Sequence, residues 1–299
     1  MAPSDTHTWL SRDGLTLCAR IYPGDLARAP VVCLPGLTRN SRDFEDLAAA
    51  IAPVRRVICP DLRGRGRSQY SPVPATYGPA QYLDDTLLML ADLGVDTFVA
   101  IGTSLGGLLA MMLASVVGAR IVGAVLNDIG PEIDPVGLAR IRGYVGVAAT
   151  FADWDAAAQA MATAQADVYP GLAHADWLRL ARRMMREQSG AIVFDYDMAI
   201  ADPIADPIAA DAGNDAGNDA GNDAGPAPDL WPLFDALAGR PVLVVRGGGS
   251  DILSRETAAA MATRHDGLEL LTLPGIGHAP TLDEPLVRDA IARLLGQVA

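Results

Sequence analysis

The chain has 299 residues, half of them apolar, which is enough for one large domain with an insertion or for two modest domains around a sizeable core. It carries 36 acidic against 23 basic residues, for a formal charge of -13, and every basic residue is arginine because the sequence contains no lysine. A polyanionic surface repels nucleic acid and anionic membranes, and the lack of lysine excludes Schiff-base chemistry and a Ser-Lys dyad.

The predicted elements begin with a hairpin at residues 7–22 that turns at Asp13-Gly14. Apolar runs rich in β-branched residues then alternate with helical patterns, and these runs cover 30–36, 55–62, 97–104, 121–129, 241–248 and 268–275. The alternation predicts a mainly parallel sheet with helices on both faces, preceded by antiparallel strands.

The strand pattern stops between Ile129 and Arg240, where amphipathic helical patterns replace it. We therefore expect a core in two parts, 1–130 and 240–299, with a helical cap inserted at 131–239. Within the cap, about 201–228, ADPI occurs twice and DAGN follows in tandem, which predicts a disordered, solvated acidic linker because the repeat has no apolar face. A calcium site is the alternative, although the repeat does not match an EF-hand loop.

The N-terminal segment and the cysteines both indicate a cytoplasmic protein. The first residues lack a basic stretch followed by an apolar one, and no apolar run reaches the roughly 20 residues of a membrane span. Cys18, Cys33 and Cys59 form no CxxC pair and no metal-binding spacing, so we expect reduced thiols and no metal.

Ser104 is the candidate nucleophile. It is the central residue of GTSLG, 102–106, which follows the predicted strand at 97–104 and precedes a helical pattern. In this context the motif forms a tight turn that exposes the serine hydroxyl, and the helix N-terminus provides N–H groups where an oxyanion would form.

A serine needs a base to remove its proton, and His278 is the best placed of the four histidines. It follows the last predicted strand, at the sheet edge where Ser104 is expected to emerge. The histidine in turn needs a carboxylate, and two candidates follow strands, Asp251 and Asp128. We favour Asp251, because an acid in the loop ahead of the histidine strand gives the usual Ser, Asp, His order, and we keep Asp128 as the alternative acid.

These motifs, with DLRGRGRS at 61–68, make residues 8–130 and 240–299 similar to the α/β-hydrolase superfamily, in its branch of cap-bearing serine esterases and lactonases. The resemblance implies an α/β-hydrolase fold with a mostly parallel eight-stranded sheet, helices on both faces and an inserted helical cap. It also implies that the N–H groups of Leu37 and Leu105 hold the oxyanion. Pro35 stands where a histidine usually precedes the glycine, which leaves a backbone donor unaffected. The arginines of DLRGRGRS are expected to order their loop.

The expected function is hydrolysis of a small-molecule carboxylic ester or lactone through an acyl-enzyme, with no cofactor and no nucleic-acid or membrane partner. A carbon–carbon bond hydrolase acting on a diketone and a cofactor-free perhydrolase are alternatives that use the same residues. A non-catalytic ligand-binding protein on this fold is a third. Candidates for an apolar pocket wall are the cap residues Trp154, Trp177, Met184, Met185, Tyr144 and Tyr196, although Met and aromatic residues at helical spacing are more often ordinary core.

Overall fold

The computed structural model describes residues 4–205 and 228–298, and its centre is a single eight-stranded sheet. The strand order is β1-β2-β4-β3-β5-β6-β10-β11. The strands are β1 (Asp5–Leu10), β2 (Thr16–Tyr22), β3 (Val31–Leu34), β4 (Val57–Asp61), β5 (Phe98–Thr103), β6 (Ile121–Asn127), β10 (Val242–Gly247) and β11 (Leu268–Leu273). Only β1 and β2 are antiparallel to their neighbours, so the predicted hairpin and the predicted parallel sheet are both confirmed.

The burial of each strand reflects its position in the sheet. The strands β3, β4 and β10 are buried at every residue, as expected for continuous apolar runs covered on both faces. By contrast, β1 at one edge is largely exposed and β11 at the other edge is only partly buried.

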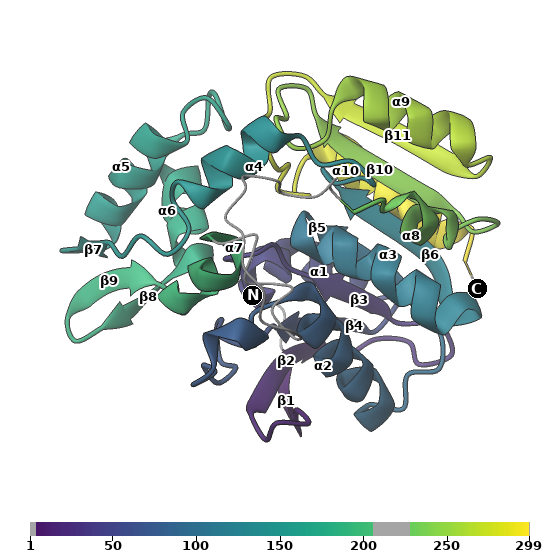
Figure 1. Ribbon diagram of the computed structural model, residues 1–299, viewed down its shortest axis with the longest axis horizontal. Helices are drawn as coiled ribbons and strands as arrows, with labels where there is room; N and C mark the ends of the chain where they lie inside the picture. Colours follow the sequence, from purple (N-terminus) through teal and green to yellow (C-terminus); the bar gives the residue numbers. More distant parts are fainter. Residues whose placement is uncertain (1–3, 206–227, 299) are drawn as a thin grey trace, which may run out of the picture.

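Helices cover both faces of the sheet, which divides the core into two apolar clusters (Figure 1). One cluster lies under α2 (Pro79–Asp92), α3 (Leu105–Val117), α8 (Trp231–Asp235) and α9 (Arg255–Arg264). The other lies under α1 (Glu45–Ile51) and α10 (Pro285–Gly296). The short 3-10 helices are η1 (Ser41–Phe44), η2 (Pro74–Thr76), η3 (Gly118–Arg120) and η4 (Met198–Ala201).

The chain from α4 to α7, between β6 and α8, forms a separate group of elements, drawn in teal and green toward the left of Figure 1. Its helices are α4 (Pro135–Arg142), α5 (Trp154–Ala164), α6 (His174–Met184) and α7 (Asp202–Ala205). It also contains a three-stranded antiparallel sheet of β7 (Thr150–Phe151), β9 (Ala191–Phe194) and β8 (Met185–Gln188). We call all of these elements the cap. Residues 206–227, which hold the acidic repeat, lie outside the described residues.

The prediction of a purely helical cap is wrong at residues 185–194. The amphipathic pattern of residues 176–188 predicts a helix that continues to Gln188, but α6 ends at Met184 and the chain enters a hairpin. Ser189 and Gly190 form its turn, with φ of 54° and 80°. Two consecutive positive φ values are what a two-residue hairpin turn requires, and this turn redirects the chain into β9.

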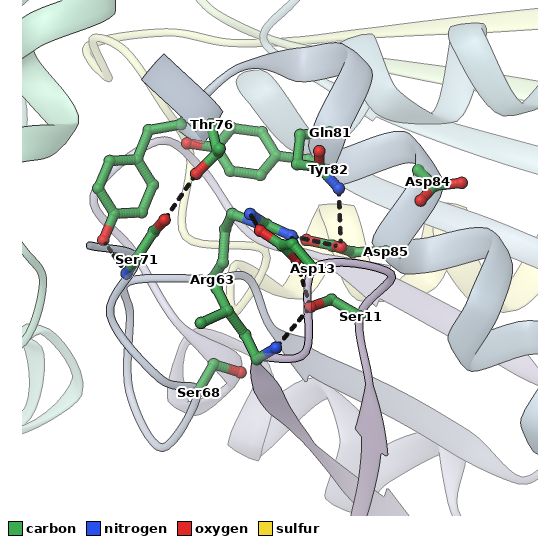
Figure 2. A network of polar contacts seen from close by, with 12 residues as sticks. Ser11, Asp13, Arg63, Ser68, Ser71, Thr76, Gln81, Tyr82, Asp84 and Asp85 are labelled. Carbon is green, nitrogen blue, oxygen red and sulfur yellow. Dashed lines mark hydrogen bonds and ion pairs between the residues drawn. The ribbon is translucent and has the colours of Figure 1, made fainter. Parts of the chain in front are cut away.

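The loop after β4 is fixed to the core by a buried arginine (Figure 2). The side chain of Arg63 is fully buried and lies between two carboxylates. It donates to Asp85 from Nε and Nη2, at 2.7 and 2.8 Å, and to Asp13 from Nη1 and Nη2, at 2.8 and 2.9 Å. The hydrogen bonds from Arg63 lower the pKa of Asp13 to about 2, whereas burial raises the pKa of Asp85.

We expect Asp13→Asn to reduce the free energy of unfolding at pH 7 by less than about 1 kcal/mol, because the Asp13 side chain is 41% exposed. A carboxylate with a lowered pKa in the folded state stabilises the fold above its unfolded pKa, and this contribution is lost as pH falls. The difference from the unmodified protein should therefore shrink from pH 3.8 to about pH 2. Urea unfolding at both ends of this range measures it. A deficit that stays constant across the range would contradict the assignment. Asp84→Asn, which removes only a surface contact with Arg12, is the matched control.

Candidate functional site

Ser104 lies in a strained turn between β5 and α3. Its φ is 52° and its ψ is -117°, a backbone conformation that L-residues seldom adopt, and it immediately precedes the first helical residue, Leu105. The N–H of Ser104 donates to Asn127 O at 2.9 Å, and its carbonyl accepts from Gly107 and Leu108. These bonds hold the turn in place and direct the side chain away from the helix axis.

The glycines of the motif allow β5, α3 and β3 to approach one another closely. A Cβ on Gly106 would lie 1.9 Å from Leu34 O, and a Cβ on Gly102 would lie 2.2 Å from Gly106 O. Since each of these contacts is with backbone, no side-chain movement can relieve it. The tight turn that the motif predicts is therefore present, and only glycine is compatible with it at these two positions.

The structure brings Ser104 and His278 together. Nε2 of His278 lies 3.0 Å from Ser104 Oγ, and Nδ1 lies 2.8 Å from Asp128 Oδ2. A carboxylate can only accept, so Nδ1 carries the proton that bonds to Asp128 and Nε2 is left to accept from the serine hydroxyl. In this arrangement the imidazole can remove the serine proton and the carboxylate can stabilise the resulting cation.

Asp128 is fully buried and follows β6 directly. Its φ of 57° turns the chain sharply, its N–H donates to Val245 O at 2.7 Å, and its Oδ1 accepts from the N–H of Gly247 at 2.8 Å. One carboxylate oxygen is thus bound to β10 and the other faces His278. The neighbouring Asn127 donates from Nδ2 to Pro280 O at 2.8 Å, which ties the histidine loop to β6.

The preference for Asp251 over Asp128 is not supported by the structure. Asp251 forms an ion pair with Arg140 of α4, with Nε and Nη2 at 2.5 and 2.8 Å from its two carboxylate oxygens. This pairing lowers the pKa of Asp251. Both acids follow strands at the same sheet edge, but β6 is hydrogen-bonded to β5, with Thr103 opposite Asn127. The alternative acid, Asp128, follows the strand next to Ser104 and contacts His278, while Asp251 follows β10, one strand further from Ser104, and binds Arg140 of the cap.

The resemblance predicts that the backbone N–H groups of Leu37 and Leu105 are the oxyanion donors. Leu105 begins α3 directly after Ser104, and Leu37 lies in the loop after β3. In the described part of the chain, no hydrogen bond uses the N–H of either residue. The carbonyl of Leu37, by contrast, accepts two hydrogen bonds from Arg65.

The cap contacts the backbone on both sides of His278. The N–H of Gly277 donates to Val168 O at 2.7 Å, and the hydroxyl of Tyr169 donates to Ala279 O at 2.6 Å. Burial raises the pKa of Tyr169 to about 12, so its hydroxyl remains a donor at neutral pH. The cap therefore holds the loop that carries the imidazole.

The cap is also fixed to the core by ion pairs beside η1. Arg183 of α6 contacts Asp46 and Asp283 at 2.5 and 2.8 Å. Arg42 of η1 reaches in the opposite direction, with Nη2 at 2.7 Å from Asp195 Oδ2. Because Arg183 and Asp195 are almost fully buried, these charges are shielded from solvent and depend on their partners.

The cap residues suggested as a pocket wall do not share one environment. Trp177, Met184 and Met185 are buried in the apolar cluster of the cap itself, and Trp154 packs against that cluster. Tyr196 belongs to the main core. Only Tyr144 is well exposed, at 47%, and the guanidinium of Arg140 lies 6.0 Å from its ring centroid.

The remaining histidines have partners away from Ser104. His7 contacts Asp92, His174 contacts Asp155, and buried His265 lies 3.0 Å from Leu237 O. Within residues 4–205 and 228–298, no group of three or more His, Cys, Asp or Glu side chains is arranged to hold a metal ion. None of the helices described is long and apolar enough to cross a membrane.

Comparisons with known proteins agree with this architecture. Residues 29–285 match the family model described as "alpha/beta hydrolase fold". The chain is 35% identical over 281 residues to a "3-hydroxybutyrate-oligomer hydrolase" of Cupriavidus necator, which covers 92% of both proteins. A crystal structure of an alpha/beta hydrolase from Novosphingobium aromaticivorans matches all of both chains at 56% identity, with a TM-score of 0.90. A putative hydrolase from Rickettsia typhi, at 24% identity and a TM-score of 0.83, covers 99% of this chain and all of its own and shares the fold. The chain therefore belongs to the alpha/beta hydrolase fold family.

Proposed function

We propose that this hydrolase cleaves a carboxylic ester through an acyl-enzyme, with Ser104 as nucleophile, His278 as base and Asp128 as the acid. The observation that carries the proposal is the continuous line of contacts from Ser104 Oγ through the His278 ring to the buried carboxylate of Asp128, at 3.0 and 2.8 Å. Asp251, bound to Arg140, is not part of it.

The proposed reaction has two stages. His278 Nε2 takes the proton as Ser104 Oγ attacks the carbonyl carbon, and the N–H groups of Leu37 and Leu105 stabilise the oxyanion. Collapse of this intermediate breaks the ester bond, and the proton on His278 passes to the departing alcohol. Water then attacks the acyl-enzyme with His278 again as base, which releases the acid and restores Ser104.

An ester of a hydroxy acid is the substrate class that the comparisons support best. The Cupriavidus necator relative is named for oligomers of 3-hydroxybutyrate, in which the units are joined by ester bonds. The match extends over nearly the whole of both chains, cap included. A linear hydroxyacyl oligomer is therefore the first substrate to test.

Ser104→Ala should lower kcat for short p-nitrophenyl esters by more than about 10³-fold, because the attacking oxygen is removed. A fluorophosphonate should modify Ser104 in the unmodified protein, and mass spectrometry of the peptide locates the adduct. Ser115→Ala removes an exposed hydroxyl from α3, where it bonds only to Met112 O, and serves as the control. Full turnover by Ser104→Ala would exclude the acyl-enzyme.

Replacing each acid separately tests which one serves His278. In Asp128→Asn, Oδ1 can still accept from Gly247, but the amide donates toward Nδ1 and forces the wrong histidine tautomer, so kcat should fall by about 10⁴-fold. Asp251→Asn breaks a half-exposed ion pair and should cost at most about 1 kcal/mol of stability, with little change in kcat. A larger loss of kcat in Asp251→Asn would reverse the assignment.

The substrate class is tested by incubating the protein with the linear trimer of 3-hydroxybutyrate, a γ-lactone, and a vinylogous diketone. We expect release of 3-hydroxybutyrate from the trimer at a higher kcat/KM than ring opening of the lactone, and no cleavage of the diketone. Liquid chromatography of the products measures all three reactions. Preferred cleavage of the diketone would identify a carbon–carbon bond hydrolase instead.

A further inference from the structure

Arg65 is a buried cation beside the loop that carries Leu37. It belongs to DLRGRGRS, its side chain is fully buried, and its Nε and Nη2 donate to Leu37 O at 2.8 and 2.6 Å. The fork of the guanidinium thus binds one carbonyl with two donors. That carbonyl belongs to the same residue whose N–H is the proposed oxyanion donor.

The contacts of Arg65 leave its side chain little freedom. Nη1 donates to Arg63 O at 2.6 Å and to the Tyr82 hydroxyl at 2.9 Å, and the guanidinium lies 4.6 Å from the centroid of the Tyr82 ring. The Arg63 network of Figure 2 fixes the same loop two residues earlier in the sequence. The cap closes over it, since Arg65 pairs with Tyr196 in an isolated β-bridge.

The loop that Arg65 holds would otherwise be loosely fixed. Leu37 follows Gly36, the residue type with the most backbone freedom, so the peptide that carries the Leu37 N–H can rotate unless its neighbours are bound. The Arg39 N–H donates to Gly36 O at 3.1 Å and closes one turn. The two hydrogen bonds from Arg65 to Leu37 O restrict the peptide group that follows Leu37. Together with the bond from Arg39, they orient the Leu37 N–H.

The charges of Arg65 and Arg63 have different partners. Arg63 is neutralised by two carboxylates, whereas Arg65 forms no ion pair with any acid in the described part of the chain. Its polar partners are carbonyls and a hydroxyl. A buried cation without a counter-ion favours negative charge nearby, and a fixed charge stabilises a transition state without reorganisation.

We infer that Arg65 is a positioning residue of the oxyanion hole: it orients the Leu37 N–H through the Leu37 carbonyl, and its positive charge, which forms no ion pair among the described residues, lies against the loop that carries this donor. This inference rests on the proposed ester hydrolysis through Ser104. It gives Arg65 a role in kcat that goes beyond ordering its loop.

The test compares Arg65→Lys and Arg65→Gln with the unmodified protein. Lysine keeps the charge but cannot bind Leu37 O with a rigid fork, and glutamine loses the charge as well. We expect kcat to fall by about 10-fold to 100-fold in Arg65→Lys and further in Arg65→Gln, with KM changed less than about 3-fold. The affinity for a boronic acid, which forms a tetrahedral adduct on Ser104, should fall in parallel with kcat/KM.

Arg55→Lys is the matched control. Arg55 is also buried and donates to backbone carbonyls, those of Ala29, Leu295 and Val298, but it lies at the amino end of β3, away from Ser104. It should lower the melting temperature with kcat unchanged. If Arg65→Lys does not fold, Tyr82→Phe removes one hydroxyl partner of Arg65 and should lower kcat a few-fold.

The outcomes separate the two proposals. If the fluorophosphonate fails to label Ser104 in the unmodified protein, the proposed function itself is wrong. If Ser104 is labelled and esters are hydrolysed, but a folded Arg65→Lys retains kcat and boronic acid affinity within 2-fold, the role of Arg65 is excluded. An equal loss of kcat in Arg55→Lys would show that replacing any buried arginine lowers kcat, and would likewise exclude a specific role of Arg65.

Discussion

The close crossing of β5, α3 and β3 determines the position of every other part of the candidate site. Gly102 and Gly106 leave no room for a Cβ against the backbone they touch, and Ser104 takes a positive φ between them. Because the backbones are this close, the start of α3 lies next to the loop after β3. The serine hydroxyl and the N–H groups of Leu37 and Leu105 can therefore meet at one place.

Buried arginines support this arrangement. Arg63 and Arg65 lie two residues apart, but one is neutralised by carboxylates while the other binds carbonyls. A guanidinium can do both because it presents several donors in a rigid plane, whereas an ammonium acts as a point charge. The chain contains no lysine, and buried positions such as these depend on the geometry of arginine.

The sequence was sufficient to predict the sheet, the hairpin before it, and the proximity of Ser104 to His278. Those features follow from apolar runs, turn residues and the rule that the carboxyl ends of parallel strands meet at one edge. The choice between Asp128 and Asp251 could not be made in this way, because both follow strands at that edge. It depends on the neighbour relation of β6 to β5 and on Arg140, a cap residue whose partner no local pattern reveals.

The cap hairpin was missed for a related reason. Residues 176–188 have a helical pattern throughout, but pairing of Met185–Gln188 with Ala191–Phe194 outweighs local preference. The role inferred for Arg65 was likewise hidden, since the loop after β4 and the loop after β3 meet only in the folded protein. The sequence shows Arg65 as the second arginine of DLRGRGRS, but it does not show that Arg65 donates to Leu37 O.

The residues of the candidate site come from distant parts of the sequence. Ser104 and Asp128 directly follow two paired strands, β5 and β6, whereas His278 is 174 residues from the serine. Asp128 is held by Val245 O and by the N–H of Gly247, so its position depends on a strand that ends only shortly before His278 in the sequence. The proposed activation of Ser104 therefore needs nearly the whole chain, together with the cap contacts to Gly277 and Ala279 on either side of His278. A chain that ends before residue 278 lacks the proposed base.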